Sequence, residues 1–352
     1  MPLPSEAKAQ LAEQKKQCIF CKIISKEIQT HIVFEDKKTI ALLDIYPAVK
    51  GHTIFLPKEH YPLLPYYEPD EIKPFFGLLP QVVKSIKGAM VSTGVDIFIA
   101  SGGAAGQQSP HFACHILPRE PADGFLNFLF NRKFGSLSTQ HQQLFLTTFP
   151  KAISGFLPQQ NLPALGKGTM PAHLEGIAKS SLILYEDEQL LVVAPAKSIA
   201  EGHLEVYSKI EAKYFEKLSI EQSIRFFSIS SLCSNVVFSI MQPQATNLIL
   251  KSGNSDDNKD GLLCTHIIPR KQGDHLQGLL WQPQQPKYDV AGVASKVKDR
   301  MWNVKYVEPA KLKEAKVEAQ KTAEQPKAEI ESDSPTVPRN EIEDAIQKLW
   351  KK

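Results

Sequence analysis

The chain has 352 residues, of which 42% are hydrophobic and 22% are charged. This length suits two domains that each bury their own core. The formal net charge of +3 is spread along the chain, so the composition gives no support to a nucleic-acid partner. We expect neither a secretory signal in the polar N-terminal segment nor a membrane span, because no stretch approaches roughly 18 apolar residues. The five cysteines suit a reducing compartment, and we expect a cytoplasmic protein.

Residues 1–17 are polar and are expected to be a flexible segment. A first domain over residues 18–150 follows, and its apolar residues alternate or run continuously in several short stretches that are typical of strands. These predicted strands cover residues 31–35, 39–44, 53–57, 95–100 and 111–117. Between the third and fourth strands, residues 69–91 have apolar side chains at helical spacing, with Pro74 and Pro80 against this assignment.

The sequence contains an internal repeat. The segment Val33-Phe34-Glu35-Asp36 is matched by Leu184-Tyr185-Glu186-Asp187 at an offset of 151 residues (184 − 33). The same offset, with no gap, relates four further pairs: Gly51-His52 with Gly202-His203, Phe75-Phe76 with Phe226-Phe227, Ser101-Gly102 with Ser252-Gly253, and His115-Ile116-Leu117-Pro118-Arg119 with His266-Ile267-Ile268-Pro269-Arg270. Such agreement in one register indicates a duplication. We therefore predict two α+β domains, each an antiparallel sheet with packed helices.

The second predicted domain covers residues 151–305, and the composition changes after it. Residues 306–339 are rich in Ala, Glu, Lys and Pro and predict a flexible linker. Residues 340–352 predict a short amphipathic helix. A tethered helix of this kind can dock on a protein partner or pack on its own chain, and the sequence does not distinguish these two interpretations.

The first domain begins with Cys18-Ile19-Phe20-Cys21. Two thiolates three positions apart can occupy one side of a tetrahedral metal site, provided that two further ligands come from elsewhere in the chain. His60, which follows a predicted strand, and His111, at the start of another, are the candidates.

The order and spacing of several segments resemble a bacterial or archaeal member of the histidine-triad (HIT) family over nearly all of residues 18–135. These segments are Cys18-Ile19-Phe20-Cys21-Lys22-Ile23-Ile24, Leu43-Asp44-Ile45-Tyr46-Pro47, Gly51-His52-Thr53, Pro57-Lys58-Glu59-His60 and Ala105-Gly106-Gln107-Gln108-Ser109-Pro110-His111. The resemblance implies a structural Zn²⁺ held by Cys18, Cys21, His60 and His111. It also implies a nucleotide pocket.

The family signature is His-x-His-x-His on one strand, and the middle histidine attacks the α-phosphate of a nucleotide substrate. Here the strand reads His111-Phe112-Ala113-Cys114-His115. Alanine has no lone pair to offer at the nucleophile position, and Cys114 is expected on the opposite face because neighbouring strand residues alternate. His115 matches the third histidine of the triad.

In the second domain the corresponding strand begins with Leu262, which replaces the metal ligand, and Cys264 stands at the nucleophile position. A thiolate there is a weak catalytic candidate, and we favour a buried thiol that fills space. Pro195 corresponds to Asp44, and Asp257-Asn258 corresponds to Gly106-Gln107. These replacements remove the implied ribose ligand and add negative charge beside the phosphate loop.

The first pocket has fewer replacements. The residues that match nucleotide-binding positions of the family are Phe20, Ile23, Leu42, Asp44, Gly106, Gln107, Gln108 and His115. Asp44 matches the ribose-binding aspartate, and Gly106 and Gln107 match the phosphate loop. Two positions depart from the family, which usually has Asn where Ala100 stands and Ser or Thr where Gln108 stands. We expect a purine nucleotide to bind, but more weakly than in an active relative.

HIT proteins commonly form homodimers whose sheets join edge to edge, with each C-terminal segment reaching the pocket of the partner. We therefore expect a monomer that forms this arrangement internally as a pseudo-dimer. The leading hypothesis is a nucleotide-binding or scaffold protein without catalysis. The alternative is an active hydrolase or transferase of nucleoside phosphoramidates or dinucleotides, in which Ala113 is not the natural residue or Cys264 or His115 acts unusually. A relative of galactose-1-phosphate uridylyltransferase ranks last, because the His-Pro-His motif of those enzymes is absent.

Overall fold

The computed structural model describes residues 5–64, 69–210 and 213–308, and residues up to Tyr306 form one compact unit. The predicted helix over 340–352 and all but the first residues of the predicted linker over 306–339 lie outside the described residues.

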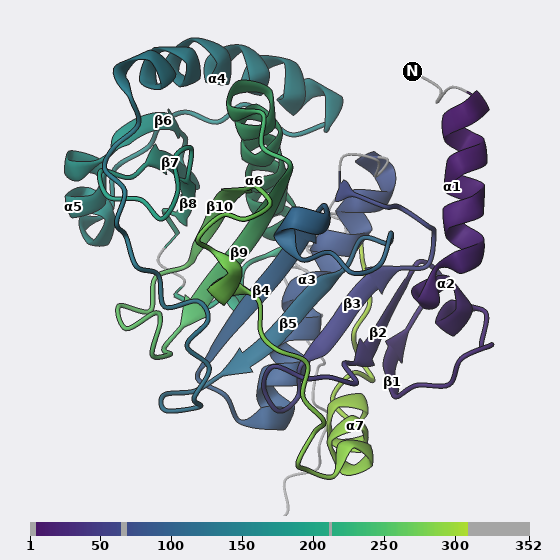
Figure 1. The fold of residues 1–352 in the computed structure, drawn as a ribbon. Coiled ribbons are helices and arrows are strands. Elements are labelled where there is room, and N and C mark those ends of the chain that lie inside the picture. The colour runs from purple at the N-terminus through teal and green to yellow at the C-terminus, as the bar shows by residue number, and fades with distance from the viewer. Residues whose placement is uncertain (1–4, 65–68, 211–212, 309–352) are drawn as a thin grey trace, which may run out of the picture. The chain divides into compact units, whose positions relative to one another are not determined.

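Strands of the whole compact unit join in one antiparallel ten-stranded sheet (Figure 1). In chain order they are β1 (Ile32–Glu35), β2 (Thr39–Leu43), β3 (Thr53–Pro57), β4 (Gly94–Ser101), β5 (Cys114–Arg119), β6 (Leu182–Glu186), β7 (Leu190–Ala194), β8 (Leu204–Ser208), β9 (Ala245–Gly253) and β10 (Cys264–Arg270). Their order across the sheet is β1-β2-β3-β5-β4-β9-β10-β8-β7-β6. The described residues up to 138, which contain strands β1–β5 and helix α3, are called the first half, and those from 139 on, which contain strands β6–β10 and helix α6, the second half. The second half repeats the strand order of the first in reverse.

The two halves meet where β4 pairs with β9. In this pairing Phe98 lies opposite Ile249, which is its own counterpart at the offset of 151 residues. Behind the sheet, α3 (Pro69–Met90) and α6 (Ile220–Met241) lie side by side. Phe76 of α3 stacks on its counterpart Phe227 of α6, with ring centroids 4.4 Å apart. Residues related by the sequence repeat therefore contact each other directly across the seam.

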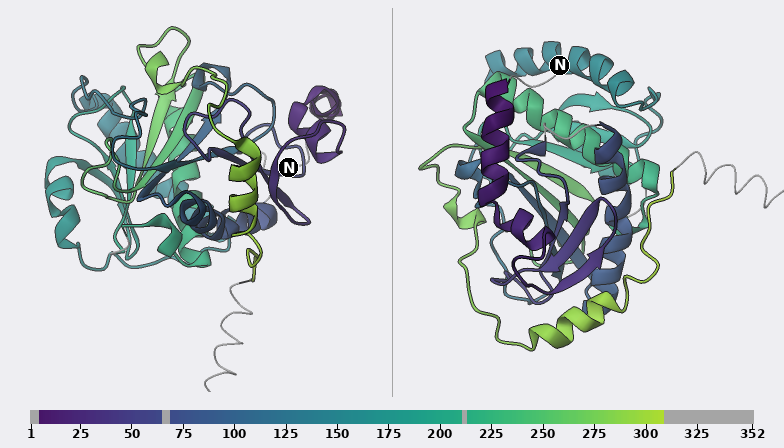
Figure 2. Two further views of the ribbon diagram at one scale, coloured as in Figure 1. Left: turned by 90° about the horizontal axis from the view of Figure 1, so that it is seen from below. Right: turned by 90° about the vertical axis from the view of Figure 1, so that its right-hand side faces the viewer.

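The remaining helices lie at the periphery of the molecule, and α1 extends away from the sheet next to α2 (Figure 2). They are α1 (Ser5–Gln17), α2 (Ile19–Ile24), α4 (Thr139–Gln159), α5 (Ala172–Ser180) and α7 (Val290–Lys298). Side chains of β2 and β3 alternate between the two faces of the sheet. Ala41 and Phe55 pack under α3, whereas Leu42 and Ile54 face α2. The second face, with α2 on it, is where the predicted site residues gather.

Three predictions about elements need correction. The expected flexible segment contains α1, whose Ala, Glu, Lys and Gln residues favour a helix and which has no Gly or Pro. The boundary expected between residues 150 and 151 falls inside α4, because Phe145 and Phe149 continue an apolar stripe that is buried. Strand β5 begins at Cys114, so the segment from His111 to Ala113 precedes the strand.

Helix α6 also differs from expectation. It is long and apolar enough to cross a membrane by length and composition, although no such stretch was expected from the sequence. Most of that stretch, 67%, is buried inside the structure, against α3 and the sheet. Burial of this kind is what a central core helix requires, since such a helix is apolar on most of its circumference.

Candidate functional site

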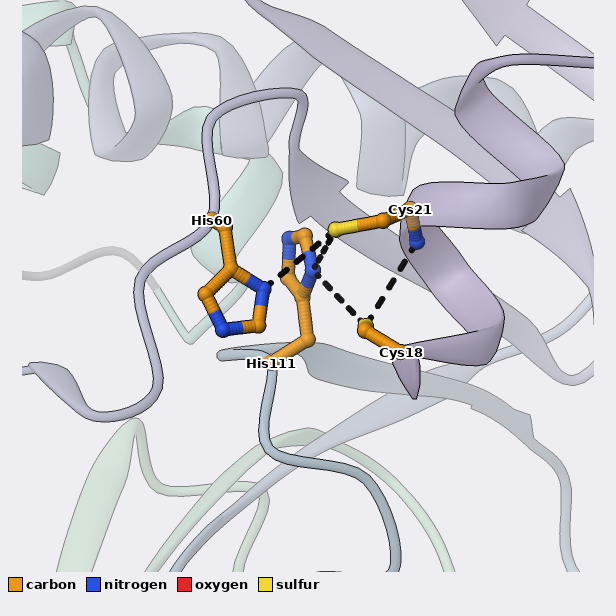
Figure 3. A group of neighbouring side chains, drawn as sticks. All are labelled: Cys18, Cys21, His60 and His111. Atoms are coloured by element: carbon orange, nitrogen blue, oxygen red, sulfur yellow. Dashed lines mark hydrogen bonds between the residues drawn. The ribbon is translucent and has the colours of Figure 1, made fainter. Parts of the chain in front are cut away.

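Four side chains from separate parts of the first half converge on one point (Figure 3). Cys18 is the N-cap residue of α2, and Cys21 lies in the first turn of that helix. His60 follows β3, and His111 precedes β5. Their ligand atoms all lie within 4.8 Å of one another. The structure thus brings together the four residues that the sequence predicted as metal ligands.

The distances within this cluster suit a tetrahedral metal ion. Cys18 Sγ lies 3.5 Å from His111 Nδ1, while Cys21 Sγ lies 3.3 Å from His60 Nδ1 and 3.6 Å from His111 Nδ1. Ligands about 2.3 Å (sulfur) and about 2.1 Å (nitrogen) from a tetrahedral zinc stand about 3.5 Å apart. These sulfur–nitrogen contacts therefore have the length of the edges of such a tetrahedron.

The hydrogen bond of His111 and the protonation states of His111 and Cys21 bear on how this cluster would bind a cation. His111 Nε2 donates to the carbonyl of Pro57 at 2.9 Å, which leaves the Nδ1 lone pair directed at the two thiols. Burial lowers the pKa of His111 to about 4 and keeps its ring neutral. Burial, together with the adjacent Cys18, raises the pKa of Cys21 to about 12. A bound cation would offset this cost by stabilising the thiolates.

A cavity of about 520 Å³ adjoins the cluster. Its wall contains every residue that the sequence predicted for nucleotide binding, namely Phe20, Ile23, Leu42, Asp44, Gly106, Gln107, Gln108 and His115. Ala113, at the predicted nucleophile position, also lines the cavity, whereas Cys114 is fully buried in the core on the α3 side. The structure thus confirms that Cys114 points away from the cavity.

A chain of hydrogen bonds fixes the tautomers of two histidines at the cavity wall. The N–H of Ala48 donates to His52 Nδ1 at 3.2 Å, so the proton of His52 is on Nε2. His52 Nε2 then donates to His115 Nδ1 at 3.0 Å. Burial lowers the pKa of both rings to about 3, so both are neutral near pH 7. His115 consequently carries its proton on Nε2 and offers the cavity a donor.

A tight turn positions this chain. Gly51, directly before His52, has φ of +82°, and a Cβ there would lie 2.6 Å from the side chain of Met90. Only glycine adopts this conformation without strain and leaves room for α3. The Gly-His pair in the sequence is thereby explained, since the turn aims His52 at His115.

Polar side chains of the loop that precedes β5 make hydrogen bonds and contacts with other groups of the protein. The side chain of Gln107 accepts from the Gly102 N–H at 2.8 Å and donates to the Pro62 carbonyl at 2.7 Å. The hydroxyl of Ser109 lies 3.6 Å from Cys18 Sγ. The Gln107 side chain was expected near a phosphate, but it is hydrogen-bonded to Gly102 and Pro62. The Ser109 hydroxyl contacts the thiol of Cys18.

Part of the cavity wall comes from the other half of the chain. The segment after β10, residues 276–285, is called the second arm, and it contributes Leu280, Trp281 and Pro283. The indole of Trp281 meets the ring of His115 at 5.5 Å and that of His52 at 5.2 Å between centroids. A Cβ at Gly106 would lie 2.5 Å from Leu280. This exchange between halves was expected from the sequence, but its residues were not identified there.

The corresponding first arm, residues 125–134, reaches the second half. Phe130, the counterpart of Trp281, packs edge-on against His266 at 4.7 Å. Arg132 pairs with Glu205 at 2.6 Å, and Tyr207 donates to the same carboxylate at 2.8 Å. Glu205 corresponds to Ile54 of the first half, so a buried charge network stands where the first half has an apolar wall. Glu205 was not predicted from the sequence, although the offset would have shown it.

His266 also pairs with Glu205, at 3.2 Å. Burial opposes ionisation of Glu205, but the hydrogen bond from His266 and the nearby Arg132 hold the pKa of this carboxyl below its usual range. Burial raises the pKa of Cys264 well above its usual value, so this residue is a neutral thiol. A neutral buried thiol is a poor nucleophile.

Comparisons with known proteins identify the family of this part of the chain. The model of the HIT domain family matches residues 25–122. A HIT-like protein of Methanocaldococcus jannaschii is 40% identical over 107 residues, which are 30% of this chain and 82% of the relative. The Hit protein of Bacillus subtilis is 35% identical over 111 residues, 31% of this chain and 77% of the relative. A crystal structure of a HIT family member from Bacillus subtilis has 29% identity and a TM-score of 0.34, and covers 38% of this chain and 95% of that one. The chain therefore belongs to the histidine-triad family.

Proposed function

We propose that this protein is a HIT-family nucleotide-binding protein without nucleotidyl-transfer activity, with a structural zinc in its first half. The observation that carries this proposal is Ala113, which lines the cavity at the position of the family's nucleophile. A methyl group cannot form the covalent nucleotidyl intermediate.

No neighbouring group among the described residues is suited to replace the missing imidazole. His115 presents an N–H rather than a lone pair to the cavity, since its Nδ1 accepts from His52. Cys114 lies in the core on the opposite face, and Cys264 belongs to the second half, where it is buried and neutral. These placements argue against the alternative in which His115 or Cys264 acts as the nucleophile.

Zinc is proposed on the chemistry and spacing of the donors. Two thiols and two neutral imidazoles with this separation match a closed tetrahedral site, in which no position remains for water. The site would connect α2 to the segments around His60 and His111, and it would thereby fix one wall of the cavity.

We further propose that the two halves form an internal pseudo-dimer of HIT-like domains. The pairing of Phe98 with Ile249, the stacking of Phe76 on Phe227 and the reciprocal arms all support it. The second half would then be a structural partner that supplies Trp281 to the cavity. A cytoplasmic location, a monomeric state and a role of residues 340–352 in binding a partner protein stay predictions.

The test is hydrolysis of an adenosine phosphoramidate by the purified protein, compared with the Ala113→His variant, with zinc measured by metal analysis. We expect an inert wild type, detectable turnover by the variant and one zinc per chain. Wild-type turnover near the rate of the variant would overturn the proposal and would identify an active hydrolase. A chain without zinc would overturn the metal assignment alone.

A further inference from the structure

The loop of residues 102–109, which forms one wall of the first cavity, is hydrogen-bonded to a side chain of the second half. Asn247 of β9 donates from Nδ2 to the carbonyl of Ala105 at 2.9 Å, and both residues are fully buried. A buried carbonyl that loses its donor is costly, because water cannot replace the missing hydrogen bond. The conformation of this wall therefore depends on a residue that does not itself line the cavity.

A second side chain fixes the orientation of the Asn247 amide. Its Oδ1 accepts from the guanidinium of Arg270 at 2.6 Å. Because arginine only donates and a carbonyl only accepts, the amide satisfies both partners in one orientation. The same guanidinium donates to the carbonyl of Leu276, the first residue of the second arm, at 3.2 Å. Asn247 and Arg270 thus connect the loop to the arm that supplies Trp281.

The loop and the second arm are in direct contact at Gly106. A Cβ at this position would lie 2.5 Å from Leu280, and the φ of Gly106 is +89°. Glycine adopts positive and negative φ with similar ease, so Gly106 alone does not keep the preceding peptide in one orientation. The carbonyl of that peptide belongs to Ala105. Its hydrogen bond from Asn247, together with the one from the Gly106 N–H to the Gly103 carbonyl, holds the peptide in place.

Backbone donors follow directly after this peptide. Gln108 and Ser109 line the cavity, and among the described residues no protein acceptor is assigned to their N–H groups. Consecutive free N–H groups of a loop suit the oxygens of a phosphate. The apolar wall that includes Phe20 and Leu42 suits a base instead. A displaced loop should therefore weaken binding of a phosphate more than binding of the rest of a nucleotide.

The first half has a different side chain at the counterpart position. At the offset of 151 residues, Asp96 corresponds to Asn247, and Arg119 to Arg270. Asp96 pairs with Arg119, but its Oδ1 is buried and accepts no hydrogen bond from the described residues. Burial and a neighbouring carboxylate raise the pKa of Asp96 to about 7, so this side chain donates only when it is protonated. The permanent amide donor is thus in the half that faces the loop of the cavity.

We propose that Asn247 is a positioning residue for the first cavity, where it holds the loop of residues 102–109 so that its free N–H groups can bind a phosphate of the ligand. The inference rests on the proposed function, because it assumes a ligand of the nucleotide class. It gives the second half a role in ligand binding that is separate from the contact made by Trp281.

Isothermal titration of the zinc-loaded full-length chain at pH 8 tests the inference, with adenosine, guanosine and their 5′-monophosphates. Two variants remove the donor. Asn247→Asp keeps the acceptor for Arg270, and it is expected to fold because the first half has an aspartate beside the equivalent arginine. Asn247→Ala removes the donor without adding a charge. We expect both variants to bind the monophosphate about fivefold or more weakly, and to bind the nucleoside within about twofold of the wild type.

Asp96→Asn is the matched control, because it changes the counterpart position and leaves the hydrogen bond between Asn247 and Ala105 intact. It should leave the affinities for nucleoside and monophosphate unchanged. Thermal unfolding and metal analysis of each variant verify that it is folded and loaded with zinc.

The outcomes separate the inference from the proposed function. If both Asn247 variants bind the monophosphate as tightly as the wild type, the inference is wrong while the proposed function stands. Equal weakening of nucleoside and monophosphate would contradict a role in positioning the phosphate donors. A loss in Asn247→Asp alone would be an effect of the added charge and would also overturn the inference. If none of the four compounds binds to the wild type, the proposed nucleotide-binding function fails together with the inference.

Discussion

The two halves have the same strand order, but the side chains at the equivalent location differ between them. The first half keeps two thiols and two imidazoles around one point and leaves a cavity of about 520 Å³ beside them. In the second half, Leu262 stands at the position of the ligand His111, and the pocket position is filled by Glu205 paired with Arg132 and Tyr207. One half has an open cavity beside four side chains that could hold a metal ion, and the other has a buried carboxylate that is neutralised by an arginine. The comparison indicates that the same strand arrangement accommodates either a set of potential metal ligands or a buried ion pair at the equivalent location.

The largest effect should come from the metal ligands. Cys18→Ser removes one of the four proposed ligands, and we expect loss of zinc together with a decrease of about 4 kcal/mol in the free energy of unfolding. The measurement is urea unfolding combined with metal analysis. Cys264→Ser, a change of the same kind in the second half, serves as the control and should retain full zinc content. Equal destabilisation by both changes would mean that the cluster has no special role in stability.

The ion pair of the second half should rank next. Arg132→Met leaves Glu205 buried without its cationic partner, and we expect a loss of about 2–3 kcal/mol, reduced because the arginine side chain is 34% exposed. The double variant Arg132→Met with Glu205→Leu should recover most of this loss, because it removes both charges. Urea unfolding of the single and double variants gives the answer. If the double variant is no more stable than the single one, the network is not an isolated charge pair.

Acid should weaken both halves through their buried histidines. His52, His115 and His203 have pKa values lowered to about 3, and His266 to about 4, chiefly by burial. The unfolded chain takes up protons near pH 6.5 while the folded chain does not. The contribution of these rings to stability is therefore complete above pH 6.5 and decreases as the pH falls toward 4, by about 1.4 kcal/mol per pH unit for each histidine.

Variants separate these contributions. His266→Gln and His115→Gln should each reduce the pH slope of the unfolding free energy between pH 6.5 and 5 by the share of one histidine. Because the wild type and the variants all contain the metal ligands, proton competition for the cluster cancels in the difference. An unchanged slope in either variant would show that the ring is already protonated in the folded state or that it does not titrate in the unfolded one.

The smallest effect should come from the arms. Trp281→Ala removes the indole that the second arm places against His52 and His115, and we expect roughly fivefold weaker ligand binding. Phe130→Ala, its counterpart in the first arm, should leave binding at the first cavity within about twofold, because its ring contacts His266 instead. Titration calorimetry with one purine nucleotide compares ligand binding by the two variants. Equal losses would indicate coupling through the seam rather than direct contact.

Much of the first site could be predicted because its chemistry depends on residue types at fixed spacing. The CxxC pair, His60 and His111 can be recognised from the sequence, and the structure brings them together. The repeat offset likewise anticipated the equivalent strands of the two halves. Such local signals need no knowledge of packing.

Other features depended on tertiary packing. Trp281 lies far along the chain from the cavity that it lines, so no local pattern identifies it. The repeat offset aligns Glu205 with Ile54, but the presence of Arg132 and His266 around this carboxylate required the structure. The start of β5 at Cys114 also required the structure, in which His111, before the strand, contacts Cys18 and Cys21. The hydrogen-bond partners of the Gln107 side chain also could not be derived from the sequence.

The outermost strands show a final consequence of the repeat. β1 and β6 form the two free edges of the joined sheet, and each has an irregularity in its register, between Ile32 and Phe34 in one and between Ile183 and Tyr185 in the other. These positions are counterparts at the same offset of 151 residues. Bulged edges twist away from a regular ladder and resist pairing with another chain. The two halves thus pair through the regular inner strands β4 and β9, whereas the irregular strands lie at the outside of the sheet, where they disfavour addition of a strand from another molecule.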